Sequence, residues 1–301
     1  MHQLPPDPFD AAAPRRPAES VRPRSKRAAA VAVLTLVATL LLAVTLVLLW
    51  MDRGSAPTLV LPTVPERAAI DPARPFLNTP AITWAEGEAG IVVAPATPVG
   101  RYPAEQVAAV MERVRQVIVA ARLNRHVLES HDAEPVLALL SAQAATGARE
   151  LIRPGNEAET WWVSAKIAEG YSLLPATPRV IGTMTARVGP DGELVISTNY
   201  LVAYAFEAWN VTQLDDPLDI VAVDRWEVDY EWVEDSRYAE ESQGLHLGAT
   251  RGFTFGANCA MVRAGFLAPG YSDTGLATGP SSQPVEAYFD PNAPLDEHSN
   301  C

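Results

Sequence analysis

The sequence predicts an α+β fold in which one transmembrane helix precedes an extracytoplasmic domain of N-terminal helices packed on a curved antiparallel sheet. Three observations predict it. Residues 28–50 form an uncharged apolar run, residues 103–152 repeat apolar side chains at helical spacing, and residues 180–262 alternate apolar and polar side chains as strands do. The chain is long enough for one sizeable core, and 48% of its residues are hydrophobic and 20% are charged.

The first 27 residues are rich in Pro, Ala and Arg and show no apolar periodicity. We expect residues 1–27 to be a disordered cytoplasmic tail, because so short a polar segment cannot bury a core. The tail carries six basic and three acidic residues, whereas the whole chain has a net charge of −13. The remainder is therefore strongly acidic, which argues against nucleic acid as a partner, since phosphate binding needs the opposite sign.

The sequence AAAVAVLTLVATLLLAVTLVLLW, residues 28–50, contains no charge, Pro or Gly. As a helix it would be about 34 Å long, enough to cross the lipid core. Basic residues precede it and only Arg53 follows closely, so the positive-inside rule predicts a single-pass protein of the cell membrane with its N-terminus in the cytoplasm. A cleaved signal peptide is the alternative, although its apolar stretch is usually shorter.

Proline-rich residues 51–80 are typical of a semi-extended linker. We place the folded domain at 81–268 and a Gly/Pro-rich C-terminal tail at 269–301, where loop or disorder is expected.

The helical half of this domain begins at Pro103. A second, shorter helix is predicted at residues 136–152. Short edge strands are predicted at residues 81–84 and 90–94, and residues 160–168 could form either a helix or a strand. The first helix presents an apolar stripe with Arg113, Arg115, Arg122 and Arg125 between its members. The stripe comprises Val107, Val110, Met111, Val114, Val117, Ile118, Ala121 and Leu128.

Strands follow. Residues 180–188 and 193–206 predict a hairpin through Gly189-Pro190-Asp191-Gly192, and a last strand is expected within 248–262. Between them, residues 220–232 alternate well. One face carries Ile220, Ala222, Trp226, Val228, Tyr230 and Trp232, and the other carries Arg225, Glu227, Asp229 and Glu231.

This order of a short tail, one span, a Pro-rich spacer, helices and then strands resembles single-pass membrane proteins of Streptomyces and related actinobacteria. Their outer domain looks like the NTF2-like or VirB8-like cone fold. The matching stretches are LNRHVLESHD, ELVISTNYLVAYAF, DRWEVDYEW and GANCAMVRAGFLAPG, within residues 100–270. The resemblance implies a fold, a topology and a role in assembly or transport scaffolding, with no catalytic motif to transfer.

The stretch HVLESHDAEP, residues 126–135, crowds two histidines with three acids. On a continuous helix His126 and Glu129 could share a ligand, but His131 would point elsewhere. If the helix ends at Ser130, Asp132 caps the next helix, and the whole stretch is a joint between helices. We favour the joint and predict no metal site and no cofactor.

Enzyme motifs are not evident, since H-E-x-x-H, G-x-S-x-G and S-x-x-K are missing and Ser164-Ala165-Lys166 is only S-x-K. Tyr200, Tyr204 and Phe206 share a strand face with Val202, and together with Asp224 they are candidates for the lining of a ligand pocket in a cone-shaped fold. Core packing is the alternative, and the more common role for such a face.

Cys259 and Cys301 are the only cysteines, and both are expected outside the membrane. An oxidising compartment favours a disulfide between them. Free thiols and intermolecular pairing are the alternatives.

Two functional classes remain. The first is a non-catalytic, membrane-anchored module for protein–protein interaction or scaffolding in the cell envelope or in a secretion or conjugation assembly. Its partner would be an envelope protein or a second copy. The second class is a small-molecule-binding protein or enzyme that uses the pocket. The sequence favours the first, because no nucleophile, base or metal set can be assembled.

Overall fold

The computed structural model describes residues 70–234, 237–273 and 284–295, all within the compact unit Val64–Cys301. The fold is α+β, as predicted, with a five-stranded antiparallel sheet in the order β1-β2-β3-β4-β5. The strands are β1 (Ala85–Glu86), β2 (Arg179–Val188), β3 (Leu194–Ala205), β4 (Val221–Val233) and β5 (Gly244–Phe255). The α-helices are α2 (Ala104–Arg122), α3 (Arg125–Ser130), α4 (Glu134–Leu137), α5 (Ala142–Leu151) and α6 (Cys259–Arg263).

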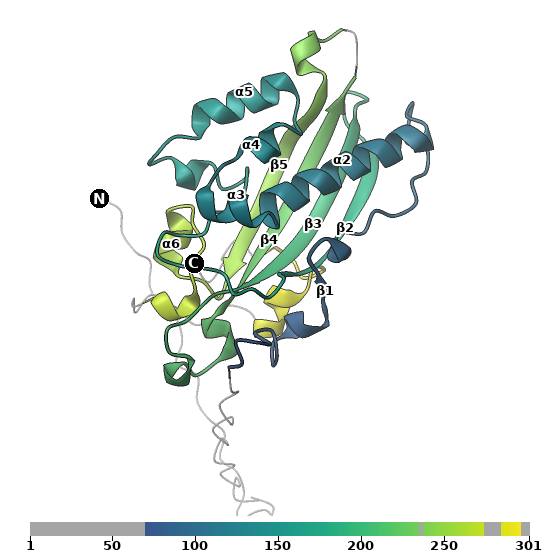
Figure 1. Cartoon of the computed structure of the whole chain (residues 1–301). Coiled ribbons are helices and arrows are strands. Elements are labelled where there is room, and N and C mark those ends of the chain that lie inside the picture. Colours follow the sequence, from purple (N-terminus) through teal and green to yellow (C-terminus); the bar gives the residue numbers. More distant parts are fainter. Residues whose placement is uncertain (1–69, 235–236, 274–283, 296–301) are drawn as a thin grey trace, which may run out of the picture. The chain divides into compact units, whose positions relative to one another are not determined.

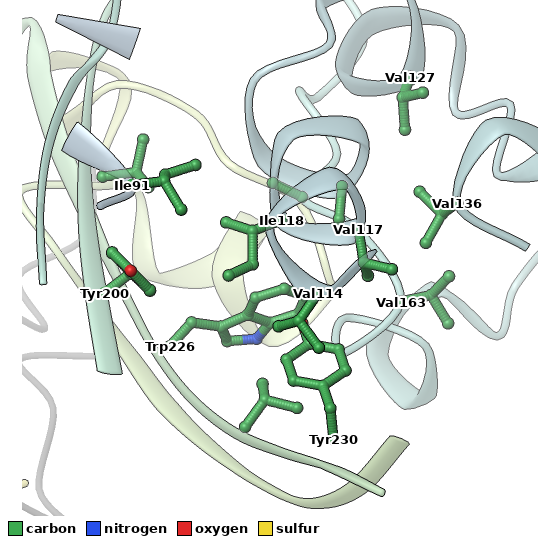
Figure 2. Close-up of a cluster of buried hydrophobic side chains, with 14 of the residues drawn as sticks. Ile91, Val114, Val117, Ile118, Val127, Val136, Val163, Tyr200, Trp226 and Tyr230 are labelled. Atoms are coloured by element: carbon green, nitrogen blue, oxygen red, sulfur yellow. The ribbon is translucent and has the colours of Figure 1, made fainter. Parts of the chain in front are cut away.

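Helices α2 to α5 lie on one face of the sheet, which we call the inner face, with α2 running across the strands (Figure 1). All eight members of the predicted apolar stripe are buried, seven of them on α2, while Leu128 lies on α3. In Figure 2, Trp226 and Tyr230 extend from the sheet towards the helix that carries Val114 and Ile118. The main core is therefore the layer between α2 and the inner face.

The predicted hairpin is confirmed as β2 and β3, joined by a turn in which Gly192 has a φ of 85°. Gly182 on β2 faces Tyr200 on β3, and a Cβ at Gly182 would collide with the Tyr200 ring. Glycine here allows the large inner-face tyrosine to lie close over its neighbouring strand.

Several predicted boundaries were wrong, because side-chain caps divide the helices. The expected helix 136–152 is interrupted, since the Ser141 side chain accepts a hydrogen bond from the Ala144 amide and starts α5 anew. The Asn124 side chain likewise starts α3. Asn258 starts α6, so the last strand ends at Phe255 instead of continuing to residue 262.

The predicted edge strands were also misplaced. Residues Pro80–Thr83 form a 3₁₀ turn, residues 91–94 have no strand structure, and the edge strand β1 lies between the two. Residues 160–168 are neither helix nor regular strand.

The opposite, outer face of the sheet has a second apolar cluster, which the sequence did not predict. Phe253 and Phe255 of β5 lie beneath Tyr288 and Phe289, and Phe255 stacks on Tyr288 with ring centroids 4.2 Å apart. Trp84 meets Phe289 at 5.8 Å, so the segment before β1 and the C-terminal segment 284–295 cover this cluster together (Figure 1). The packed residues thus extend beyond 81–268 at both ends.

Polar contacts hold the C-terminal segment as well. The buried Arg225 side chain donates to the carbonyl oxygens of Pro291 at 2.9 Å and Ala293 at 2.7 Å. The Asn199 amide adds a bond of 2.8 Å to the Pro291 carbonyl. We refer to residues 284–295 as the C-terminal strap.

The predicted span 28–50 lies outside the described residues. Among the described helices, none is both long and apolar enough to cross a membrane.

Replacing Tyr288 with Ala is expected to lower the free energy of unfolding by about 3 kcal/mol, because it removes a buried aromatic ring that stacks on Phe255. The matched control is Val285→Ala in the same strap, where the side chain is 39% exposed and a change within about 0.5 kcal/mol is expected. Urea titration followed by tryptophan fluorescence measures both. Equal midpoints for the two variants would contradict a stabilising role for the strap.

Candidate functional site

An ion pair lies inside the main core, where the end of α2 meets β4. Arg122 Nη1 is 3.0 Å from Asp224 Oδ2, and the two residues are only 3% and 9% exposed. Burial lowers the pKa of Arg122 and raises the pKa of Asp224, and the attraction between the two groups opposes both shifts. Such a pair is tolerated in a core only when further hydrogen bonds satisfy it.

Those further bonds are partly present. Thr254 on β5 donates to Asp224 Oδ1 at 3.2 Å, and Arg122 Nη2 donates to the Trp161 carbonyl at 3.3 Å. The Arg122 guanidinium lies over the Trp226 ring, which adds a cation–π contact. Arg122 Nε is buried and has no hydrogen-bond partner. One donor of the ion pair is therefore still unsatisfied.

The irregular segment 160–168 runs beside this pair and is fixed by main-chain hydrogen bonds. Ala165 donates to the Ala121 carbonyl at 3.1 Å, and Ile167 donates to the Leu128 carbonyl at 2.8 Å. On the other side, the Leu267 amide donates to the Lys166 carbonyl at 2.7 Å. These bonds place Lys166 between the helices and the turn after α6.

Lys166 is only 5% exposed, and its Nζ donates to the Thr160 carbonyl at 3.1 Å. Burial, with the nearby charge of Arg122, lowers the pKa of Lys166 to about 8. Among the described residues no carboxylate lies within ion-pair distance of this ammonium group. Lys166 is thus a buried cation with no carboxylate in direct ion-pair contact in the described part of the chain, although the more distant negative charge of Glu157 opposes the lowering of its pKa.

Arg122, Lys166 and Asp224 line the same cavity, which has a volume of about 200 Å³. Ser164 and Thr254 contribute hydroxyl groups to its wall. The remaining lining residues carry no charge. They are Trp161, Ala165, Gly252, Phe253, Val262, Gly265, Phe266 and Leu267. The wall therefore carries two cationic side chains and one carboxylate, in largely apolar surroundings.

The four candidate pocket residues from the sequence lie on the inner side of the sheet, but only Asp224 lines this cavity. Tyr204 and Phe206 are fully buried, and the Tyr204 hydroxyl donates to the Arg122 carbonyl at 2.9 Å. Tyr200 is 2% exposed, and burial raises its pKa to about 12. These three aromatic residues belong to the core that supports the cavity floor.

The stretch 126–135 has the geometry of a helix joint. Helix α3 ends at Ser130, and His131 adopts the left-handed conformation with a φ of 61°. The predicted cap was wrong by one residue, because the N-cap of α4 is Ala133, although the Asp132 side chain accepts a hydrogen bond from the Glu134 amide. His131 Nε2 donates to the Ile167 carbonyl at 2.8 Å and so helps hold the segment that carries Lys166. Over the described ranges, no group of three or more His, Cys, Asp or Glu residues is placed to hold a metal ion.

Cys259 is the first residue of α6 and is 2% exposed. Its predicted partner Cys301 lies outside the described residues, so the disulfide stays a prediction.

The sequence reading missed Arg122, Lys166 and Ser164. Arg122 was placed on the polar side of the first helix, yet it follows Val114 and Ile118 at four-residue intervals and so falls on the buried stripe. Asp224 likewise has the inward phase of Ala222 and Trp226. The sequence therefore contained a signal for this site, namely a cation, Arg122, and a carboxylate, Asp224, each at a position of an otherwise apolar face. Nothing comparable marks Lys166, because its segment has no regular periodicity.

Comparison of the chain with protein-family models, with curated proteins and with solved structures finds no match.

Replacing Asp224 with Asn is expected to lower the free energy of unfolding by roughly 3–5 kcal/mol, because it leaves the Arg122 charge buried without compensation. The double variant Arg122→Met, Asp224→Asn should lose less free energy of unfolding than the single variant, because it no longer contains the uncompensated Arg122 charge. Denaturant titration compares the two.

Glu134→Gln, which removes the exposed pair of Glu134 with Arg149, is the control and should change stability little. A double variant less stable than Asp224→Asn would show that the uncompensated charge is not the main cost.

Proposed function

We propose that the extracytoplasmic domain binds a small molecule with an anionic group in the cavity formed by Arg122, Lys166 and Asp224. The observation that supports this most directly is the charge balance of the wall, where Asp224 is engaged by Arg122 and Lys166 has no carboxylate partner among the described residues. A buried, unpaired charge is costly, so a ligand that supplies the missing negative charge gains that energy on binding.

The size and walls of the cavity narrow the ligand class. One water molecule needs about 10–15 Å³ of such space, so a cavity of about 200 Å³ admits a small organic molecule. The excess positive charge of the cavity wall is one, since Arg122 and Lys166 face the single carboxylate of Asp224. A small monocarboxylate fits this combination, with its apolar part against Trp161 and Phe266.

Binding is proposed in preference to hydrolysis. Ser164 and Lys166 both line the cavity, but no hydrogen bond joins the Ser164 hydroxyl to the Lys166 amine in the described structure. An activated serine requires such a contact with its base.

We further propose that this domain is held outside the cell membrane by residues 28–50 and has the NTF2-like cone form. The sequence pattern of the span supports the first part. Helices that precede an antiparallel sheet and pack on its inner face support the second.

A second candidate function is the scaffolding role that the sequence favoured, with an envelope protein or a second copy as partner. One observation supports it. Trp209, in the connection between β3 and β4, is 86% exposed, and exposed tryptophans are frequent anchors of protein interfaces.

Lactate is expected to bind the full-length protein in calorimetry at pH 7, whereas the neutral analogue lactamide is not. Lys166→Met should weaken lactate binding at least about tenfold, because it removes the unpaired cation. Arg263→Met is the matched control, since this exposed cation on α6 lies beside the cavity residue Val262 without lining the cavity. Equal affinity for lactate and lactamide would contradict an anion site.

The affinity should also depend on pH. The pKa of free Lys166 is about 8, so the ammonium form that binds the carboxylate is lost above that value. Lactate affinity is therefore expected to be constant below pH 7 and to fall up to about tenfold per pH unit above pH 8. Lys166→Met should abolish this dependence. A flat profile for the unmodified protein between pH 7 and pH 9.5 would exclude Lys166 as the anion's partner.

The scaffolding candidate predicts that crosslinking of the full-length protein in its host cells captures a reproducible partner or dimer. Trp209→Ser should reduce the captured product severalfold through loss of an interface anchor, and Lys166→Met should leave it unchanged. Mass spectrometry of the crosslinked species measures both. Capture that does not respond to Trp209→Ser would remove the support that this residue gives.

A further inference from the structure

Lys166 has features of a reactive amine as well as of an anion partner. It lines a cavity, is almost entirely buried, and has a single hydrogen-bond acceptor, the Thr160 carbonyl. The only other lysine in the chain is Lys26. The described part of the protein therefore holds one primary side-chain amine, and that amine lies in the wall of the cavity.

The protonation state of this amine differs from that of an ordinary lysine. With a pKa of about 8, about a tenth of Lys166 is neutral at pH 7, against less than about a thousandth for an unperturbed lysine. Only the neutral amine has a free electron pair for attack on a carbonyl carbon. Buried lysines next to a second cation are activated in this way, and Arg122 is the second cation here.

Arg122 also gives the cavity a means of orienting a carbonyl compound. Arg122 Nη1 and Nη2 each have one N–H hydrogen beyond those given to Asp224 and to the Trp161 carbonyl. When Lys166 is neutral and no longer pairs with the carboxylate, a ligand that carries a carbonyl group next to its carboxylate can place the carboxylate at these Arg122 hydrogens while the carbonyl carbon approaches Lys166. The volume of about 200 Å³ admits the smallest members of this class.

We propose that the ligand of this cavity is a small 2-oxo acid and that Lys166 Nζ forms a reversible imine with its carbonyl carbon. This inference rests on the proposed anion-binding function and specifies its ligand class.

The chemistry balances without an oxidant or a reductant. The nitrogen electron pair forms the new C–N bond, while the carbonyl π electrons move to oxygen, which takes up a proton and gives a carbinolamine. Loss of that hydroxyl group as water leaves the C=N bond. The sum is amine plus carbonyl compound to imine plus water, and protonation of the imine keeps one positive charge at this position of the wall.

The test uses the full-length protein incubated with pyruvate at pH 7.5 and then treated with cyanoborohydride, whose hydride converts an imine into a stable secondary amine. Peptide mass mapping then compares Lys166 with Lys26. Labelling of Lys166 is expected to exceed labelling of Lys26 at least about tenfold, in line with its larger neutral fraction. Acetone, which has a carbonyl but no carboxylate, should label Lys166 much less than pyruvate does.

Lactate provides the control that separates the two proposals, because it has the carboxylate but no carbonyl and cannot form an imine. If lactate binds and pyruvate leaves no adduct at Lys166, the imine is excluded and anion binding stands. If neither compound binds, both proposals fail. Equal labelling of Lys166 and Lys26, or equal labelling by pyruvate and acetone, would also overturn the imine. An excess of lactate should compete with pyruvate and suppress the adduct at Lys166.

Discussion

The ion pair between Arg122 and Asp224 is the constraint to which the inner side of this fold is fitted. Two charges in a core need both each other and further hydrogen bonds, and the need fixes where the end of α2 sits relative to β4 and β5. Arg122 also donates a hydrogen bond to the Trp161 carbonyl. This bond holds the irregular segment 160–168 against the end of α2. Lys166 belongs to that segment. The hydrogen bonding of the buried Arg122 therefore helps determine where the second buried cation, Lys166, lies.

The elements that the sequence predicted well are those with a strong period and a single buried face. The stripe of α2, the β2–β3 hairpin and the alternation of β4 from Ala222 onward follow directly from side-chain spacing, because packing against one partner layer imposes one phase. Ile220 was predicted on the same face, but it precedes β4 and packs in the outer cluster. The breaks between α2 and α5 were harder to predict. They depend on single polar side chains such as Ser141 and Asn124, which were not distinguished from polar residues inside a helix until their bonds were known.

The candidate site was predictable only in part, and for a physical reason. Asp224 was identified, and the inward phase of Arg122 was available from its position four residues after Ile118. Lys166 could not be found in this way, since main-chain bonds to Leu128 and Leu267 set the course of its segment, and main-chain bonds have no signature in side-chain order. Sites assembled from irregular segments escape periodicity analysis even when the surrounding layers are read correctly.

The C-terminal strap has a consequence for the biosynthesis of the protein. Phe253 and Phe255 are made more than thirty residues before the two aromatic rings that cover them, Tyr288 and Phe289. During synthesis the sheet can form before residues 284–295 have emerged, and the part of its outer face beneath Tyr288 and Phe289 is then uncovered. A ribosome that adds roughly 5–20 residues per second leaves this apolar face open for a few seconds. The nascent chain therefore passes through an interval in which a chaperone, or a neighbouring nascent chain, competes with the strap for the same surface.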